Sequence, residues 1–107
     1  MPFIINTAPS RPPESVHLVS DVERSILVNI TPPAIQYRNG VLKGYIIYYS
    51  ATSDDEPTLY NITTASTVAR LSDLQVYTEY TVWVSAFSRA GTGPQSEGSK
   101  MMTQESG

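Results

Sequence analysis

The feature that most constrains the fold is a repeated alternation of apolar side chains with other side chains over short segments. In the longest case, Tyr80, Val82, Val84 and Ala86 occupy every second position. Successive side chains of a β-strand point to opposite faces, so this alternation predicts a strand with one buried face. Shorter alternations or strand-like segments predict further strands around Val16 and Leu18, Ile26 to Ile30, Tyr45 to Tyr49, Leu59 to Thr63, Thr67 to Leu71 and Ser99 to Thr103.

Turn residues separate these segments. Pro32-Pro33 ends the second strand, and we expect turns at Asn39-Gly40 and from Gly91 to Pro94. Short strands without helical periodicity predict an all-β fold of two packed antiparallel sheets with seven strands. No repeat is found, so we expect one domain over 11–104, a linker or N-terminal extension over 1–10 and a frayed tail over 105–107, with a proline-rich entry from Pro9 to Pro13.

Composition narrows the possible functions. Of 107 residues 16% are charged, the net charge is −3, and seven basic residues are scattered along the chain. This pattern argues against nucleic acid or an anionic membrane as a partner. No apolar run is long enough to insert into a bilayer. The chain has no cysteine, which excludes disulfides, thiolate metal sites and cysteine nucleophiles.

Several motifs in the same order resemble fibronectin type III domains. They are Pro12-Pro13 before the first strand, Pro32-Pro33, Gly44-Tyr45-x-Ile47-x-Tyr49, the segment from Leu74 through Tyr80 to Ala86, and Gly91-x-Gly93-Pro94-x-Ser96. The resemblance implies a seven-stranded immunoglobulin-like β-sandwich. It also implies a tyrosine corner, in which Tyr80 buries its ring and bonds the backbone near Leu74. Two positions depart from the family: Ile30 replaces a usual core tryptophan, and Val76 stands where proline is common.

One tryptophan lies out of phase with the buried residues. If Tyr80, Val82 and Val84 point inward, Trp83 and Phe87 point outward, beside the outward Ile46 and Tyr48 of the neighbouring strand. An apolar outer stripe is typical of a protein interface. Three alternatives remain open here: cross-strand packing without a partner, cover by Leu59, Tyr60, Arg70 or Lys100, and a bulge that turns Trp83 inward.

Other candidate sites are weaker. Asn61 and Asn29 both begin N-glycosylation sequons, and Asn61 is the better exposed of the two in this reading. The acidic run Asp54-Asp55-Glu56 is typical of a solvated turn and not of a calcium loop, so we expect no metal and no cofactor. His17 is the only histidine and has no obvious nucleophile beside it, which argues against an enzyme.

The resemblance implies a non-catalytic module that binds proteins and spaces domains in the extracellular part of a plasma-membrane receptor or adhesion protein. Receptor-type tyrosine phosphatases and neural adhesion proteins are examples. We expect a monomer whose partners are neighbouring domains, cell-surface proteins or matrix proteins. Candidate loop contacts are Tyr37, Arg38, Asn39, Arg89 and Thr92. A passive spacer, an accessory domain of a secreted enzyme and an intracellular muscle-type array are the alternatives.

Overall fold

A computed structural model describes residues 8–20, 24–34, 41–52 and 58–104. Within these ranges the secondary structure consists of β-strands: β1 (Ser15–Ser20), β2 (Ile26–Thr31), β3 (Gly44–Ala51), β4 (Tyr60–Thr64), β5 (Val68–Leu71), β6 (Glu79–Ser88), β7 (Gly91–Thr92) and β8 (Ser99–Met102). No helix in the described ranges is long and apolar enough to cross a membrane.

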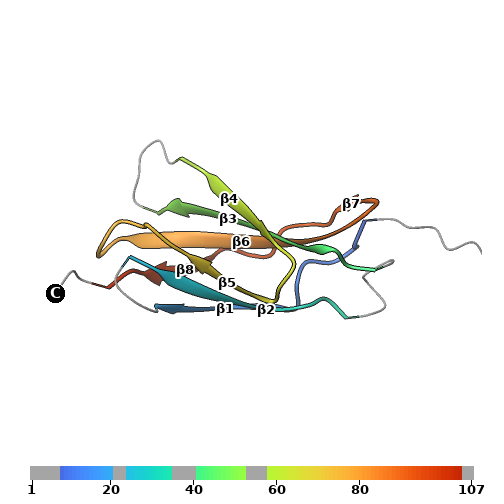
Figure 1. Cartoon of the computed structure of the whole chain (residues 1–107), viewed down its shortest axis with the longest axis horizontal. Helices are drawn as coiled ribbons and strands as arrows, with labels where there is room; N and C mark the ends of the chain where they lie inside the picture. Colours follow the sequence, from blue (N-terminus) through green and yellow to red (C-terminus); the bar gives the residue numbers. More distant parts are fainter. Residues whose placement is uncertain (1–7, 21–23, 35–40, 53–57, 105–107) are drawn as a thin grey trace, which may run out of the picture.

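The strands form two antiparallel sheets that face each other (Figure 1). The smaller sheet has the order β1-β2-β5, and the larger, five-stranded sheet has the order β4-β3-β6-β7 with β8 also paired to β6. The predicted all-β sandwich is therefore confirmed. The described chain enters before β1 at one end of the sandwich and leaves after β8 at the opposite end (Figure 1).

The last strand differs from the prediction because it is divided in two. Gly91 and Thr92 belong to β7 and pair with Ser88 and Phe87, so the reversal is made by Arg89 and Ala90. The segment between β7 and β8 stays bonded to β6, through Gly93 N–H to the Ala86 carbonyl and Ser96 N–H to the Val84 carbonyl. The predicted turn at 91–94 was therefore placed about two residues too late.

The core lies between the sheets and is built from the inward side chains of the alternating segments. Val28, Ile47, Val82, Val84 and Ala86 have no exposed surface. The rest of the buried apolar set is Leu18, Ile26, Ile30, Tyr45, Ala51, Leu71, Leu74 and Tyr80. The small Ile30, at the position of the usual tryptophan, is buried in the same cluster as the large Tyr45. Alternation thus identified the inward face of each long strand.

The loop between β5 and β6 joins the two sheets at one end of the sandwich. Tyr80 is buried, and its hydroxyl accepts a hydrogen bond from the backbone N–H of Gln75 at 3.0 Å, one residue beyond Leu74. Arg24, which precedes β2, donates from Nε to the Leu74 carbonyl and accepts from the Leu74 N–H. Bonds from two directions therefore hold the backbone at Leu74 and Gln75.

Thr103 adds a third connection to this loop, which the sequence did not suggest. Its side chain is 2% exposed. The hydroxyl donates to the Gln75 carbonyl at 2.6 Å and accepts from the Thr78 N–H at 2.9 Å. Thr103 also donates its own N–H to the Thr78 carbonyl. The end of β8 is thereby fixed to the β5–β6 loop.

Replacing Thr103 with valine keeps the shape but leaves these partly buried loop groups without their hydroxyl partner. Because an unsatisfied buried polar group costs about 1–3 kcal/mol, we expect the free energy of unfolding to fall by about that amount. Urea titration followed by circular dichroism measures it. Thr92→Val, at an exposed threonine of β7, is the control and should stay within about 0.5 kcal/mol of the wild type. Equal stability of Thr103→Val and the wild type would contradict this role.

Candidate functional site

The candidate interaction surface is the outer face of the five-stranded sheet, defined here as the outward side chains of β3, β4, β6 and β8. Within it, Tyr48 lies directly opposite Trp83, and Ile46 lies opposite Ser85. Phe87 lies opposite Gly44, whose missing side chain leaves room for the phenyl ring. The sheet thus brings together the four apolar residues that alternation placed on this face.

The pairing of β3 with β6 excludes a bulge in β6. Pairs run without interruption from Gly44 with Phe87 to Ala51 with Tyr80. Val82 and Val84, on either side of Trp83, have no exposed surface. The alternative in which Trp83 turns into the core is therefore wrong.

The outer face is partly covered instead of openly exposed. Ile46, Tyr48, Trp83 and Phe87 are all half-buried, and Ser85 between them is 1% exposed. A β-carbon on Gly98 would lie 2.9 Å from Trp83 Nε1 and 2.8 Å from Thr81 Cγ2. The backbone just before β8 therefore passes close over the edge of the indole ring.

Of the residues proposed to cover Trp83, Tyr60 and Arg70 lie elsewhere, whereas Lys100 lies on the same face. Tyr60 pairs with Tyr49 and stacks on its ring at 5.5 Å, which places it on the inner face of the sheet. Arg70 belongs to β5 in the other sheet. Lys100 pairs with Thr81 and so shares the outer face with Trp83. Sequence reasoning missed the part played by Gly98, because a contact between backbone and ring leaves no pattern in side-chain type.

Three tyrosines gather on the inner face at the other end of the sheet. The Tyr49 ring stacks on Tyr60 and lies 6.5 Å from the Tyr80 ring at an interplanar angle of 60°. Burial raises the pKa of the Tyr49 hydroxyl, and the neighbouring Tyr60 and Tyr80 raise it further. The neutral phenol is therefore favoured in the folded protein.

This shift predicts a loss of stability in alkaline solution. In the unfolded chain Tyr49 has its ordinary pKa of about 10, so it loses its proton at a lower pH than in the folded chain. The contribution of Tyr49 to the free energy of unfolding is complete below about pH 10. It is lost as the pH rises through the higher pKa that Tyr49 has in the folded chain. Urea unfolding between about pH 8 and 11 should show this decline, and Tyr49→Phe should make it shallower. An equally steep decline in Tyr49→Phe would rule out this cause.

The two sequons occupy different environments. Asn61 is exposed in β4, an edge strand, and lies directly opposite Tyr48 on the outer face. Asn29 is half-buried in β2, the central strand of the smaller sheet, between His17 and Val68.

The loop candidates are only partly described. Arg89 and Thr92 are exposed at the reversal between β6 and β7. Tyr37, Arg38, Asn39 and the acidic residues 54–56 lie outside the described residues. Among the described residues no three His, Cys, Asp or Glu side chains come together as metal ligands.

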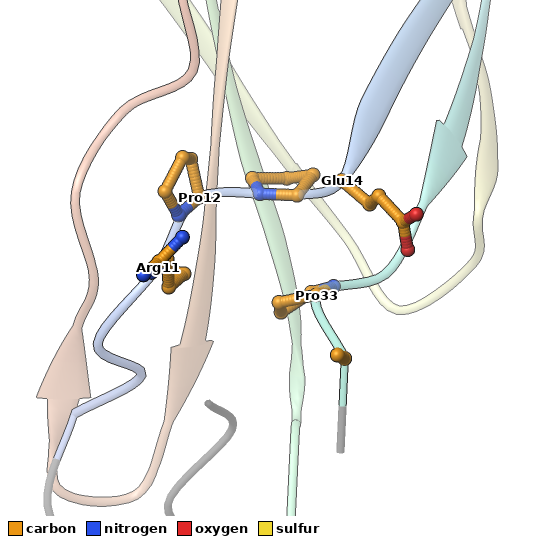
Figure 2. A pocket seen from close by; sticks show the side chains of 6 residues that line it. Arg11, Pro12, Glu14 and Pro33 are labelled. Carbon is orange, nitrogen blue, oxygen red and sulfur yellow. The ribbon is translucent and has the colours of Figure 1, made fainter. Parts of the chain in front are cut away.

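A shallow hollow lies where the N-terminal segment meets the end of β2 (Figure 2). It has a volume of about 380 Å³ and is lined by Arg11, Pro12, Pro13, Glu14, Pro33 and Ala34. Figure 2 shows Arg11 beside Pro12 on one side of Pro33, with Glu14 on the other side. Rigid apolar rings make this a fixed surface that is suited to contact.

The segment before the hollow also packs on the domain, although residues 1–10 are predicted as a linker. Pro9 is buried, and a β-carbon on Gly93 would lie 2.6 Å from the Pro9 carbonyl oxygen. The Ala8 β-carbon would lie 3.6 Å from a β-carbon added to Gly91. The two glycines after β6 thus leave room for the incoming chain.

Comparison with known proteins agrees with this architecture. The family described as fibronectin type III domain matches residues 11–102. Receptor-type tyrosine-protein phosphatase F of Danio rerio is 33% identical over 102 residues, 92% of this chain and 5% of the relative. The human cell adhesion molecule DSCAM is 36% identical over 95 residues, 87% of this chain and 5% of the relative.

A solved structure gives the same result for the fold. The third fibronectin III domain of the human KIAA0343 protein superposes with a TM-score of 0.82 at 24% identity, covering 95% of this chain and 88% of that one. The chain spans about 5% of the length of the curated relatives named above. With the two-sheet topology and the match over residues 11–102, the chain belongs to the fibronectin type III family.

Proposed function

We propose that this domain is a protein-binding and spacing module in the extracellular part of a multidomain receptor or adhesion protein. One observation carries the proposal. Most of this chain is similar to one short segment of a receptor phosphatase and to one short segment of an adhesion molecule. The fibronectin type III domain is itself non-catalytic. Its contribution is therefore contact and geometry.

Two features of the fold support spacing. The described ends lie at opposite ends of the sandwich, so domains joined in series extend one another (Figure 1). The packing of Pro9 beside Gly93 holds the chain against the domain ahead of β1. Proline-rich, packed linkers limit the angles between neighbours.

Two surfaces support binding. The outer face offers Tyr48 and Trp83, and tyrosine and tryptophan are enriched among the residues that dominate binding energy. The β6–β7 reversal offers the exposed cation of Arg89 at one end of the sandwich. Neither surface includes a residue of the buried core.

The test is a binding screen of the 107-residue chain, presented as a tetramer, against a panel of cell-surface ectodomains. We expect a hit that is weakened at least tenfold by Tyr48→Thr with Trp83→Thr, or by Arg89→Glu, about 1.4 kcal/mol of binding free energy. Val19→Thr, at a 39% exposed position of the smaller sheet, is the matched control and should bind normally. No hit would favour a passive spacer, and a hit insensitive to both sets of variants would show that the partner binds elsewhere on the domain.

A further inference from the structure

The strand register places a glycosylation sequon beside the aromatic pair of the outer face. Asn61 on β4 lies opposite Tyr48 on β3, and Tyr48 lies opposite Trp83 on β6. Neighbouring strands are about 4.8 Å apart, so the three residues form one row about 10 Å long across the sheet. Side chains of such a row point to the same side of the sheet.

The chemistry of the row suits a sugar attached at its exposed end. Asn61 is exposed, whereas Tyr48 and Trp83 are half-buried and keep part of their rings open to solvent. Aromatic rings carry a negative face that attracts the polarised C–H groups lining one side of a sugar ring. A glycan leaving Asn61 along the row therefore meets Tyr48 first and Trp83 next.

The position of β4 in the sheet provides a second argument. β4 is an edge strand, and its sequence, YNITT, contains neither a charged residue nor a proline. Folded proteins usually protect edge strands from pairing with other chains by such residues or by a covering group. A bulky, hydrated glycan at the second residue of β4 supplies that cover.

The second sequon has neither property. Asn29 lies on a central strand, is half-buried, and has His17 and Val68 as cross-strand neighbours instead of the tyrosine and tryptophan in the row of Asn61. Pro32 also follows this sequon directly. Asn29 therefore serves as the comparison site within the same chain.

We propose that Asn61 carries an N-linked glycan whose first sugars lie over Tyr48 and reach towards Trp83. The chain's own carbohydrate then covers part of the outer face, and access of a protein partner to this face depends on whether Asn61 is occupied. The inference rests on the proposed extracellular function, because N-linked glycans are added in the secretory pathway.

The first experiment identifies the site. The chain is secreted from mammalian cells as wild type, Asn61→Gln and Asn29→Gln, and intact masses are compared before and after glycosidase treatment. We expect the wild type and Asn29→Gln to carry the glycan and Asn61→Gln to lose it. A glycan-bearing Asn61→Gln protein with an unmodified Asn29→Gln protein would overturn the assignment, as would an unmodified wild type.

The second experiment tests contact with the aromatic pair and requires no binding partner. Trp83 is the only tryptophan, so acrylamide quenching of its fluorescence reports on this face alone. We expect a lower quenching constant for the wild type than for Asn61→Gln. The glycan should also raise the melting temperature, and Tyr48→Thr should abolish most of that increase. Equal quenching and an unchanged increase in Tyr48→Thr would show a glycan that points away from the face.

These outcomes are separable from the proposed function. An occupied Asn61 that protects Trp83, together with a binding screen that also fails for Asn61→Gln, would support the glycan and reject the interaction role. A partner bound through Tyr48 and Trp83 on a chain unmodified at Asn61 would do the reverse.

Discussion

Tyr80→Ala is expected to lower the free energy of unfolding by about 3–5 kcal/mol, as for other large aromatic-to-alanine changes in cores. The ring is 5% exposed and lies beside Tyr49 in the core. Its removal leaves a cavity at the end of the sandwich where the β5–β6 loop crosses between the sheets. It also removes the acceptor of the Gln75 N–H. Chemical denaturation monitored by circular dichroism measures the loss.

Two further substitutions divide this effect into ring and hydroxyl. Tyr80→Phe keeps the ring and should cost about 0.5–1.5 kcal/mol, the net value of one hydrogen bond. Tyr77→Phe is the matched control: Tyr77 lies in the same loop, is 62% exposed and should change stability by less than about 0.5 kcal/mol. If Tyr80→Phe unfolds at the same denaturant concentration as the wild type, the tyrosine corner contributes no hydrogen bond to stability.

Gly44→Val is expected to cost about 3 kcal/mol or more, at the upper end for overpacked positions. A β-carbon at Gly44 would overlap the backbone carbonyl oxygen of Thr64 and lie 3.1 Å from the Phe87 ring. The carbonyl belongs to β4 and cannot turn aside without breaking the pairing of β3 with β4. Thermal and urea unfolding give the loss in stability.

Gly44→Ala and Lys43→Ala complete this series. The alanine at position 44 should cost about 1–3 kcal/mol, less than valine, because it adds a single carbon. Lys43 is the exposed preceding residue, and Lys43→Ala should stay within about 0.5 kcal/mol of the wild type. If Gly44→Val were as stable as the wild type, the Thr64 carbonyl of β4 would not lie against Gly44 of β3.

The sequence predicted the strands well because their alternation records the difference between a core face and a solvent face. β6 is the clearest case: Tyr80, Val82, Val84 and Ala86 are all buried, as their spacing required. Alternation also placed Trp83 outside. Strand ends were less accurate, as at β7, because Gly91 and Thr92 pair with β6 through their backbones and carry no side-chain signal.

The surroundings of the site could not be predicted, because they depend on contacts between distant segments. The sequence does not show that Gly98 passes over Trp83, or that Tyr60 turns inward onto Tyr49. The single row formed by Asn61, Tyr48 and Trp83 requires the register of three strands. Each of these relations is fixed by pairing and packing across the sheet.

The most direct test of the central claim, that Trp83 lies half-covered on the outer face, is acrylamide quenching of the unglycosylated chain. A neutral quencher is needed because Lys100 shares this face. The unfolded chain in urea provides the fully exposed reference. The structure predicts a quenching constant for native Trp83 that is clearly above zero and below that reference. Gly98→Ala, which crowds the edge of the indole ring, should change this constant. A blue-shifted emission with almost no quenching would place Trp83 in the core and contradict both the face and the interaction proposed for it.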